Sequence, residues 1–338
     1  MVRLTIFLRC VVLLLPAVVV IVLGANAAAQ YTLTTLVTTS QDPNLINAWG
    51  MAYATGGPFW ISDNVTGKST VYDASGTIVP TVVTIPAAKT GAKGSPTGIV
   101  ANSTSGFVVT QNAVSGPSNF IFASMDGIIS GWNPSVNASS AVIAVNNHGT
   151  ANYTGLTIAT VSAGTFIYAA NSAKNQIEVY DINFHLVKTF TDATLTGLRV
   201  YGVQAIKGRI YVTFQGTSGG AVDVFTPSGT LAKLLTKNGS SGPLLAPWAV
   251  ALAPANFGTF SNDLLVGNVN NGQIHAINLT TGKVAGTLKD TKGATISVPG
   301  LWALLFGGGT ATNGNTDQLF FAAGTGNYGT GEFGVINP

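Results

Sequence analysis

Apolar and polar residues alternate along most of this chain in short runs, and one such pattern occurs three times. The copies are WISDNVTGKSTVYD at 60–73, YAANSAKNQIEVYD at 168–181 and LVGNVNNGQIHAIN at 265–278. Each has an apolar run, an Asp or Asn, a turn, an alternating run and a closing Asp or Asn. Alternation with a period of two predicts strands, and two such runs around a short turn predict a β-hairpin. A hairpin written three times indicates a repeat architecture.

Short apolar strands with a small residue near their start precede these hairpins and recur along the whole chain. They contain Trp49-Gly50, Thr97-Gly98, Thr154-Gly155, Tyr201-Gly202, Trp248-Ala249 and Trp302-Ala303. Their spacing of about 50 residues, with several short strands per unit, is typical of propeller blades. No later segment shows a sustained helical period. The sequence therefore predicts an all-β, six-bladed β-propeller: one domain over 30–338, with units starting near 44, 94, 152, 199, 245 and 297.

The last unit lacks an outer strand, and the beginning of the domain offers one. After Phe333–Ile336 the sequence stops at Pro338. The segment Tyr31–Val37 alternates as a strand and belongs to no earlier unit. We expect this N-terminal strand to join the last blade, because the pairing would close the ring and cover an open sheet edge.

Residues 1–29 have the composition of a secretory signal peptide. Arg3 and Arg9 precede an apolar run from Val11 to Leu23, and small residues follow it. That run is shorter than the ~20 residues of a membrane span, which favours cleavage over anchoring. We therefore expect a secreted or periplasmic protein with no membrane span after cleavage. The single cysteine, Cys10, lies in this segment, so the mature chain would have no disulfide.

Charge narrows the range of partners. The formal net charge is +3, only 8% of residues are charged, and no basic run is present. Nucleic-acid binding depends on clustered Lys and Arg, so this class of partner is excluded. We expect a monomer that binds other extracytoplasmic molecules.

The hairpin pattern resembles the NHL repeat, in which a strand ends in an acidic or amide residue before a short turn. The wider pattern is similar to a family of secreted bacterial conserved hypothetical proteins of unknown function. The matching segments are 47–50, 59–64, 96–100, 126–132, 246–248, 264–268 and 300–304. The resemblance implies a propeller and export. It implies no catalytic residues.

Asp63, Asn171 and Asn268 occupy the same position in three units, directly after the second strand. Propeller symmetry places equivalent residues on a common face. Their side-chain oxygens could converge on Ca²⁺ or another hard cation. Alternatively, each side chain caps its own turn by hydrogen-bonding to the local backbone. Asp73, Asp181 and Asp223 lie at or near the ends of third strands, and we expect them to share a turn role.

Trp49, Trp248 and Trp302 open inner strands in three units, which predicts that they surround one mouth of the channel. Exposed aromatic rings there would stack on sugars or pack against a peptide. The alternative is that the three side chains fill the wedges between blades.

The sequence favours a binding protein over an enzyme. We expect an exported NHL-like propeller that acts as a binding or scaffold module for a glycan, a peptide or a protein, with Trp49, Trp248 and Trp302 on the binding face. No cofactor is required, although Ca²⁺ is possible. The alternative is a metal-assisted hydrolase or lyase that holds a divalent cation at the channel through Asp63, Asn171 and Asn268.

Overall fold

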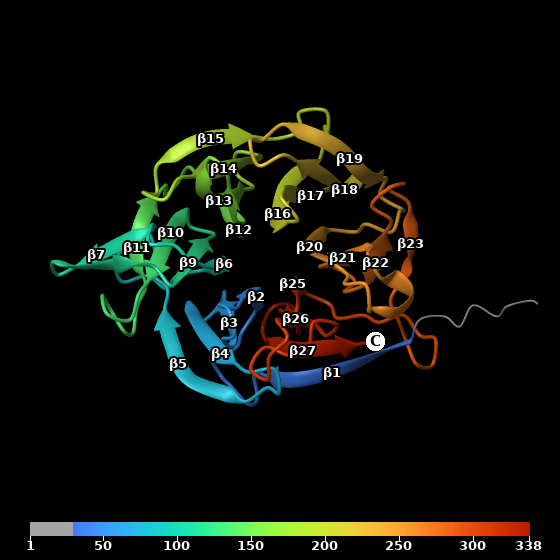
Figure 1. The fold of residues 1–338 in the computed structure, drawn as a ribbon, viewed down its shortest axis with the longest axis horizontal. Coiled ribbons are helices and arrows are strands. Elements are labelled where there is room, and N and C mark those ends of the chain that lie inside the picture. Colours follow the sequence, from blue (N-terminus) through green and yellow to red (C-terminus); the bar gives the residue numbers. More distant parts are fainter. Residues whose placement is uncertain (1–29) are drawn as a thin grey trace, which may run out of the picture.

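The structure is a computed structural model that describes residues 30–338, and its secondary structure is almost entirely β. Six sheets surround a central axis, and the chain passes through them in order around the ring (Figure 1). The described region has a single helical element, the short 3-10 helix η1 (Gly258–Phe260), and nothing in it is long and apolar enough to be a membrane-spanning helix. The predicted six-bladed β-propeller is confirmed. The predicted signal peptide, residues 1–29, lies outside the described residues.

Each blade runs from an inner strand beside the axis to an outer strand at the rim, and neighbouring strands within it are antiparallel. Blade I contains β2 (Ala48–Ala52), β3 (Phe59–Asp63), β4 (Lys68–Tyr72) and β5 (Ile78–Thr84). Blade II contains β6 (Pro96–Ala101), β9 (Phe120–Ser124), β10 (Ile128–Trp132) and β11 (Val142–Asn146). Blade III contains β12 (Tyr153–Val161), β13 (Gly164–Asn171), β14 (Gln176–Tyr180) and β15 (Leu186–Phe190).

The second half of the chain repeats this order. Blade IV contains β16 (Arg199–Ile206), β17 (Arg209–Gly216), β18 (Gly219–Phe225) and β19 (Leu231–Asn238). Blade V contains β20 (Pro247–Leu252), β21 (Leu264–Asn268), β22 (Ile274–Ile277) and β23 (Val284–Thr287). Blade VI contains β25 (Leu301–Phe306), β26 (Leu319–Ala323), β27 (Glu332–Asn337) and the N-terminal strand β1 (Gln30–Thr38).

Strand β1 closes the ring as predicted. It pairs antiparallel with β27, from Thr32 opposite Asn337 to Thr38 opposite Glu332. On its other side it pairs briefly, in parallel, with β24 (Lys289–Asp290), which follows blade V. Tyr31 anchors the strand: its ring is buried and stacks on Phe257, and its hydroxyl donates to the Phe257 carbonyl oxygen at 3.0 Å. Pairing and burial together stabilise the closure without a covalent link.

The irregular second unit carries an extra hairpin. Strands β7 (Val108–Gln111) and β8 (Val114–Pro117) form a separate two-stranded sheet that projects from the rim (Figure 1). Asn112 and Ala113 link them with positive φ angles of 51° and 66°. Two consecutive left-handed residues make the tight turn that suits the right-handed twist of a hairpin.

The small residues of the inner strands are explained by close approach around the axis. A Cβ atom on Gly50 would collide with the backbone of Thr97, and one on Gly202 would collide with that of Trp248. Hydrogen bonds also link the inner strands of neighbouring blades. The Thr154 hydroxyl, for example, donates to the Tyr201 carbonyl oxygen at 2.7 Å. Tight packing at the axis therefore leaves only a narrow channel.

Candidate functional site

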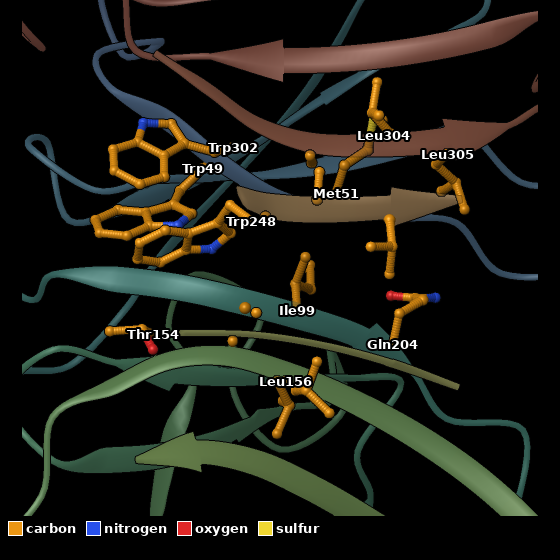
Figure 2. A pocket seen from close by; sticks show the side chains of 18 residues that line it. Trp49, Met51, Ile99, Thr154, Leu156, Gln204, Trp248, Trp302, Leu304 and Leu305 are labelled. Atoms are coloured by element: carbon orange, nitrogen blue, oxygen red, sulfur yellow. The ribbon is translucent and has the colours of Figure 1, made fainter. Parts of the chain in front are cut away.

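Trp49, Trp248 and Trp302 meet at one end of the channel (Figure 2). The ring centroids of Trp49 and Trp302 are 4.0 Å apart, and those of Trp248 and Trp302 are 4.7 Å apart. The three residues are 5%, 7% and 9% exposed, respectively. The structure thus brings the predicted tryptophans together, and their faces are largely covered by one another.

Tyr201 extends this cluster and belongs to the same structural position. It opens the inner strand of blade IV as the tryptophans open those of blades I, V and VI, and its ring centroid lies 4.8 Å from that of Trp248. Its residue type differs from that of the three tryptophans, but the shared pattern Tyr201-Gly202 and Trp49-Gly50 is the sequence signal that identifies it. We call Trp49, Tyr201, Trp248 and Trp302 the aromatic cluster.

Tyr328 and Asn47 flank the cluster on its blade VI side. The Tyr328 ring lies 5.4 Å from Trp302 and is 41% exposed. The Trp302 indole N–H donates to Asn47 Oδ1 at 2.8 Å, whereas the buried Trp49 indole N–H has no partner among the described residues. Tyr201 and Tyr328 therefore offer the more accessible aromatic surface at this mouth of the channel.

The channel itself is small and mostly apolar. Its cavity volume is about 80 Å³, enough for a few water molecules. The three tryptophans cover one end, and Met51, Leu305 and Gln204 lie toward the other (Figure 2). No acidic or histidine side chain lines this cavity within the part of the chain that the structure describes.

Asp63, Asn171 and Asn268 do occupy equivalent places, at the ends of the second strands of blades I, III and V. All three are fully buried, and none lines the channel. Among residues 30–338, no group of three or more His, Cys, Asp or Glu side chains is placed to hold a metal ion.

The side-chain amides of Asn171 and Asn268 both form hydrogen bonds with nearby residues. Asn171 Nδ2 donates to Glu178 Oε1 at 2.8 Å, and its Oδ1 accepts from the Asn152 backbone N–H at 3.2 Å. Asn268 Nδ2 donates to the Pro243 carbonyl oxygen at 2.7 Å, and its Oδ1 accepts from the Leu245 backbone N–H. Within residues 30–338, only one backbone contact of these amides lies within the residue's own turn, from the Lys174 N–H to Asn171 Oδ1 at 3.3 Å. The other backbone contacts tie the end of the second strand to the segment that leads into the inner strand of the same blade.

Asp63 is in a different situation, because neither of its carboxyl oxygens has a hydrogen-bond partner within residues 30–338. Burial raises the pKa of this carboxyl well above its usual range, and nearby Asp42 raises it further, while the adjacent Thr70 hydroxyl has the opposite effect. A neutral buried acid is a poor ligand for a cation unless binding displaces its proton.

A cleft opens beside the aromatic cluster, between blades IV and V. Its volume is about 390 Å³, within the range of roughly 300–1,000 Å³ typical of small-molecule sites. One wall is the β17–β18 turn, and the other is the segment that leads into β20. The lining residues are Tyr201, Gln215, Gly216, Thr217, Gly219, Ser240, Leu244, Leu245, Ala246 and Asn270.

No family model matches the chain. An uncharacterized protein of Acanthamoeba polyphaga mimivirus is 28% identical over 288 residues, which cover 78% of this chain and 69% of that protein. A second from the same virus is 28% identical over 216 residues, covering 58% of this chain and 39% of the other. A third is 26% identical over 285 residues, covering 78% and 74%.

The chain is also similar to solved propeller structures. A streptogramin B lyase aligns with a TM-score of 0.54 at 14% identity, covering 91% of this chain and 97% of that one. A PQQ-bound aldose sugar dehydrogenase from Streptomyces coelicolor aligns with a TM-score of 0.57 at 14% identity, covering 92% and 99%. At this identity the likeness shows the fold alone. The resemblance to the NHL repeat and to a secreted bacterial family is not confirmed by these comparisons, whereas the six-bladed β-propeller is.

Proposed function

We propose that the protein is an exported binding module that recognises a glycan, peptide or protein through the face that carries the aromatic cluster. The observation that supports this most is the gathering of aromatic side chains from four blades at a single mouth. Aromatic side chains provide large contact surfaces with little conformational freedom to lose on binding. A propeller fold holds such a face rigidly while its loops vary.

Binding is favoured over hydrolysis or elimination by the residues that line the two cavities on this face. Neither the channel nor the adjacent cleft has an acidic or histidine side chain among its described lining residues. General acid–base chemistry needs such a group within hydrogen-bonding reach of the substrate. The aromatic and amide side chains that are present suit recognition instead.

Arrays of glycans and peptides, probed with residues 30–338, would test this function. The tryptophans are unsuitable as first variants, because truncating a buried Trp typically costs about 3–5 kcal/mol of stability. The double variant Tyr201→Ala/Tyr328→Ala removes accessible aromatic surface instead. We expect array binding that this variant lowers by about tenfold or more at an unchanged melting temperature. Binding that survives intact in the double variant, or no binding at all, would contradict the proposal.

Export is tested separately by expressing the full chain in a secreting host. Cleavage of the signal peptide predicts a product that starts near Ala28 or Gln30, as measured by intact mass. Retention of Arg3 and Arg9 in the mature product would contradict export by this route.

A further inference from the structure

We infer that the cleft between blades IV and V binds a neutral saccharide, with one sugar ring lying against Tyr201. This inference rests on the proposed binding function and makes it more specific. It names the ligand class and moves the point of contact from the buried tryptophans to a neighbouring cleft. The tryptophans are at most 9% exposed, whereas Tyr201 lines an open volume of about 390 Å³.

The chemistry of the lining is neutral and rich in hydrogen-bonding groups. None of the described lining residues is charged. Polar groups come from a phenol, two amides and two hydroxyls, contributed by Tyr201, Gln215, Asn270, Thr217 and Ser240. Hydroxyl and amide groups both donate and accept hydrogen bonds, as sugar hydroxyls do. An anionic ligand would instead call for Arg or Lys.

These polar groups are available to a ligand. No hydrogen bond within residues 30–338 engages the side chains of Tyr201, Gln215, Asn270, Thr217 or Ser240, in contrast to Asn268, whose amide is used on both sides. Five such side chains around a single cleft match a ligand that carries many hydroxyls. Leu245 and Ala246 add a small apolar surface of the kind that meets the C–H groups of a sugar ring.

Tyr201 is held in place before any ligand arrives. Its ring packs on Trp248 at 4.8 Å with an interplanar angle of 49°, and its carbonyl oxygen accepts the Thr154 hydroxyl. Since the ring is already fixed by the aromatic cluster, little side-chain entropy is lost on binding. The cluster then acts as the support of a binding surface, and Tyr201 forms that surface.

The wall formed by the β17–β18 turn is shaped by glycine. Gly219 has a φ of 126°, and a Cβ atom there would collide with the Asn238 backbone. The nearest cation in the register is Arg199, which pairs with Gln215 across β16 and β17. Its guanidinium donates to the Ser172 and Ala173 carbonyl oxygens of blade III. This anchoring directs the positive charge to blade III and leaves the cleft neutral.

A peptide fits this cleft less well. One common way for an extended peptide to bind is to add a strand to an open sheet edge. Here the described walls are the β17–β18 turn and the segment before β20, and neither is an edge strand. The ligand that matches both the shape and the chemistry is a compact, uncharged molecule rich in hydroxyls.

The test is titration of residues 30–338 with neutral tetrasaccharides of glucose and of N-acetylglucosamine, and with a sialylated and a uronic-acid oligosaccharide as acidic probes. Intrinsic tryptophan fluorescence and calorimetry report binding. We expect a neutral probe to bind, with an affinity that 0.5 M NaCl leaves within about twofold, because no charge pair is involved. Tyr201→Ala should lower the affinity by about tenfold and Asn270→Ala by about fivefold, whereas Tyr201→Phe should stay within about threefold.

Tyr328→Ala is the matched control on the other side of the cluster and should change the affinity by less than about twofold. Melting temperatures identify any variant that has lost its fold, and Asn270→Ala, at an exposed position of the cleft, keeps the test decisive in that case. Binding of only the acidic probes, or loss of binding in Tyr328→Ala but not in Tyr201→Ala, would overturn the inference and leave the binding function standing. If neither saccharides nor peptides bind the aromatic face, both proposals fail.

Discussion

Glu178 and Asp223 occupy the same place in neighbouring blades, yet their surroundings differ completely. Each is fully buried and lies in the third strand, two residues before the aromatic residue that ends it, with Glu178 opposite Ala169 and Asp223 opposite Val212. Glu178 accepts hydrogen bonds from four donors, whereas neither carboxyl oxygen of Asp223 has a hydrogen-bond partner in the described region. The fold fixes the position of a buried acid, and its neighbours decide its charge.

The donors around Glu178 come from four side chains. Tyr153 and Tyr180 donate to Oε2 at 2.7 and 2.8 Å, and Asn171 and Gln176 donate to Oε1 at 2.8 and 3.0 Å. Burial acts to raise the pKa of Glu178, but these hydrogen bonds outweigh burial and lower it. Glu178 is therefore a charged group inside the protein, and its charge is stabilised by neutral donors.

Asp223 has a carboxylate for a neighbour instead. Burial, followed by the charge of Asp192, raises its pKa to about 8, and the charge of Lys237 offsets only part of this effect. Burial and a neighbouring negative charge both disfavour the ionised form of a carboxyl group. Asp223 therefore keeps its proton to a higher pH than an exposed aspartate does.

The largest effect is expected from Glu178→Ala. The change leaves two buried tyrosine hydroxyls and two amides without their acceptor, and it opens a cavity. The free energy of unfolding at pH 7 should fall by about 4 kcal/mol, measured by urea denaturation of residues 30–338. A loss below about 1 kcal/mol would show that the donors find other partners and that the network is not what stabilises blade III.

Asp223→Asn should change how stability depends on pH. Folded Asp223 keeps its proton up to about pH 8, while in the unfolded chain it loses it near the ordinary value of 3.8. In this window the unfolded state binds fewer protons, so wild-type stability falls as pH rises, by at most about 1.4 kcal/mol per pH unit, and levels off above the folded pKa.

Asparagine cannot titrate, so the variant lacks this slope. Relative to wild type, its free energy of unfolding should increase by about 2 kcal/mol between pH 6 and pH 8. Parallel denaturation curves at both pH values measure the difference. Glu178 does not interfere, because its lowered pKa places its titration below this window. Equal slopes for the two proteins would mean that Asp223 is ionised throughout.

The sequence predicted the architecture well and the structural role of Asp223 poorly. Period, strand pattern and the missing outer strand all follow from local alternation, and β1 extends the predicted Tyr31–Val37 by only one residue at each end. Asp223, by contrast, was grouped with Asp73 and Asp181 as a turn residue. Those two do accept backbone N–H groups in their turns, from Thr77 and His185 among others.

The grouping was wrong for Asp223 because blade IV uses a different residue at the turn. Thr226 follows the strand there, and its hydroxyl oxygen accepts the Thr230 backbone N–H. Asp223 lies three residues earlier, inside β18. A short polar residue near a strand end can belong to the turn or to the interior, and only the register separates the two. The cleft escaped prediction for a related reason, since its walls come from turns in two different blades.

A milder change at Glu178 sharpens the comparison with Asp223. Glu178→Gln keeps one oxygen for Asn171 and Gln176, but its amide nitrogen faces two tyrosine hydroxyls that previously donated. We expect a loss of about 1 kcal/mol at pH 7, where Asp223→Asn is neutral or stabilising. Below pH 4.5 the cost should shrink, because wild-type Glu178 loses its stabilising contribution as pH falls through its lowered pKa. If Glu178→Gln and Asp223→Asn changed the free energy of unfolding in the same direction at pH 7, the distinction between a charged Glu178 and a neutral Asp223 would be contradicted.

The smallest effect is expected from Lys174→Ala. The Lys174 Nζ atom lies 3.7 Å from Glu178 Oε1, which makes this the one Lys or Arg ion pair with an acid in the described residues, but the lysine side chain is 45% exposed. Solvent screens such a pair, so its removal should cost no more than about 0.5 kcal/mol in urea denaturation. If Lys174→Ala cost as much as Glu178→Ala, a cation would be what keeps Glu178 charged. A near-neutral result assigns that role to the hydroxyl and amide donors, which blade III places around this position and blade IV does not.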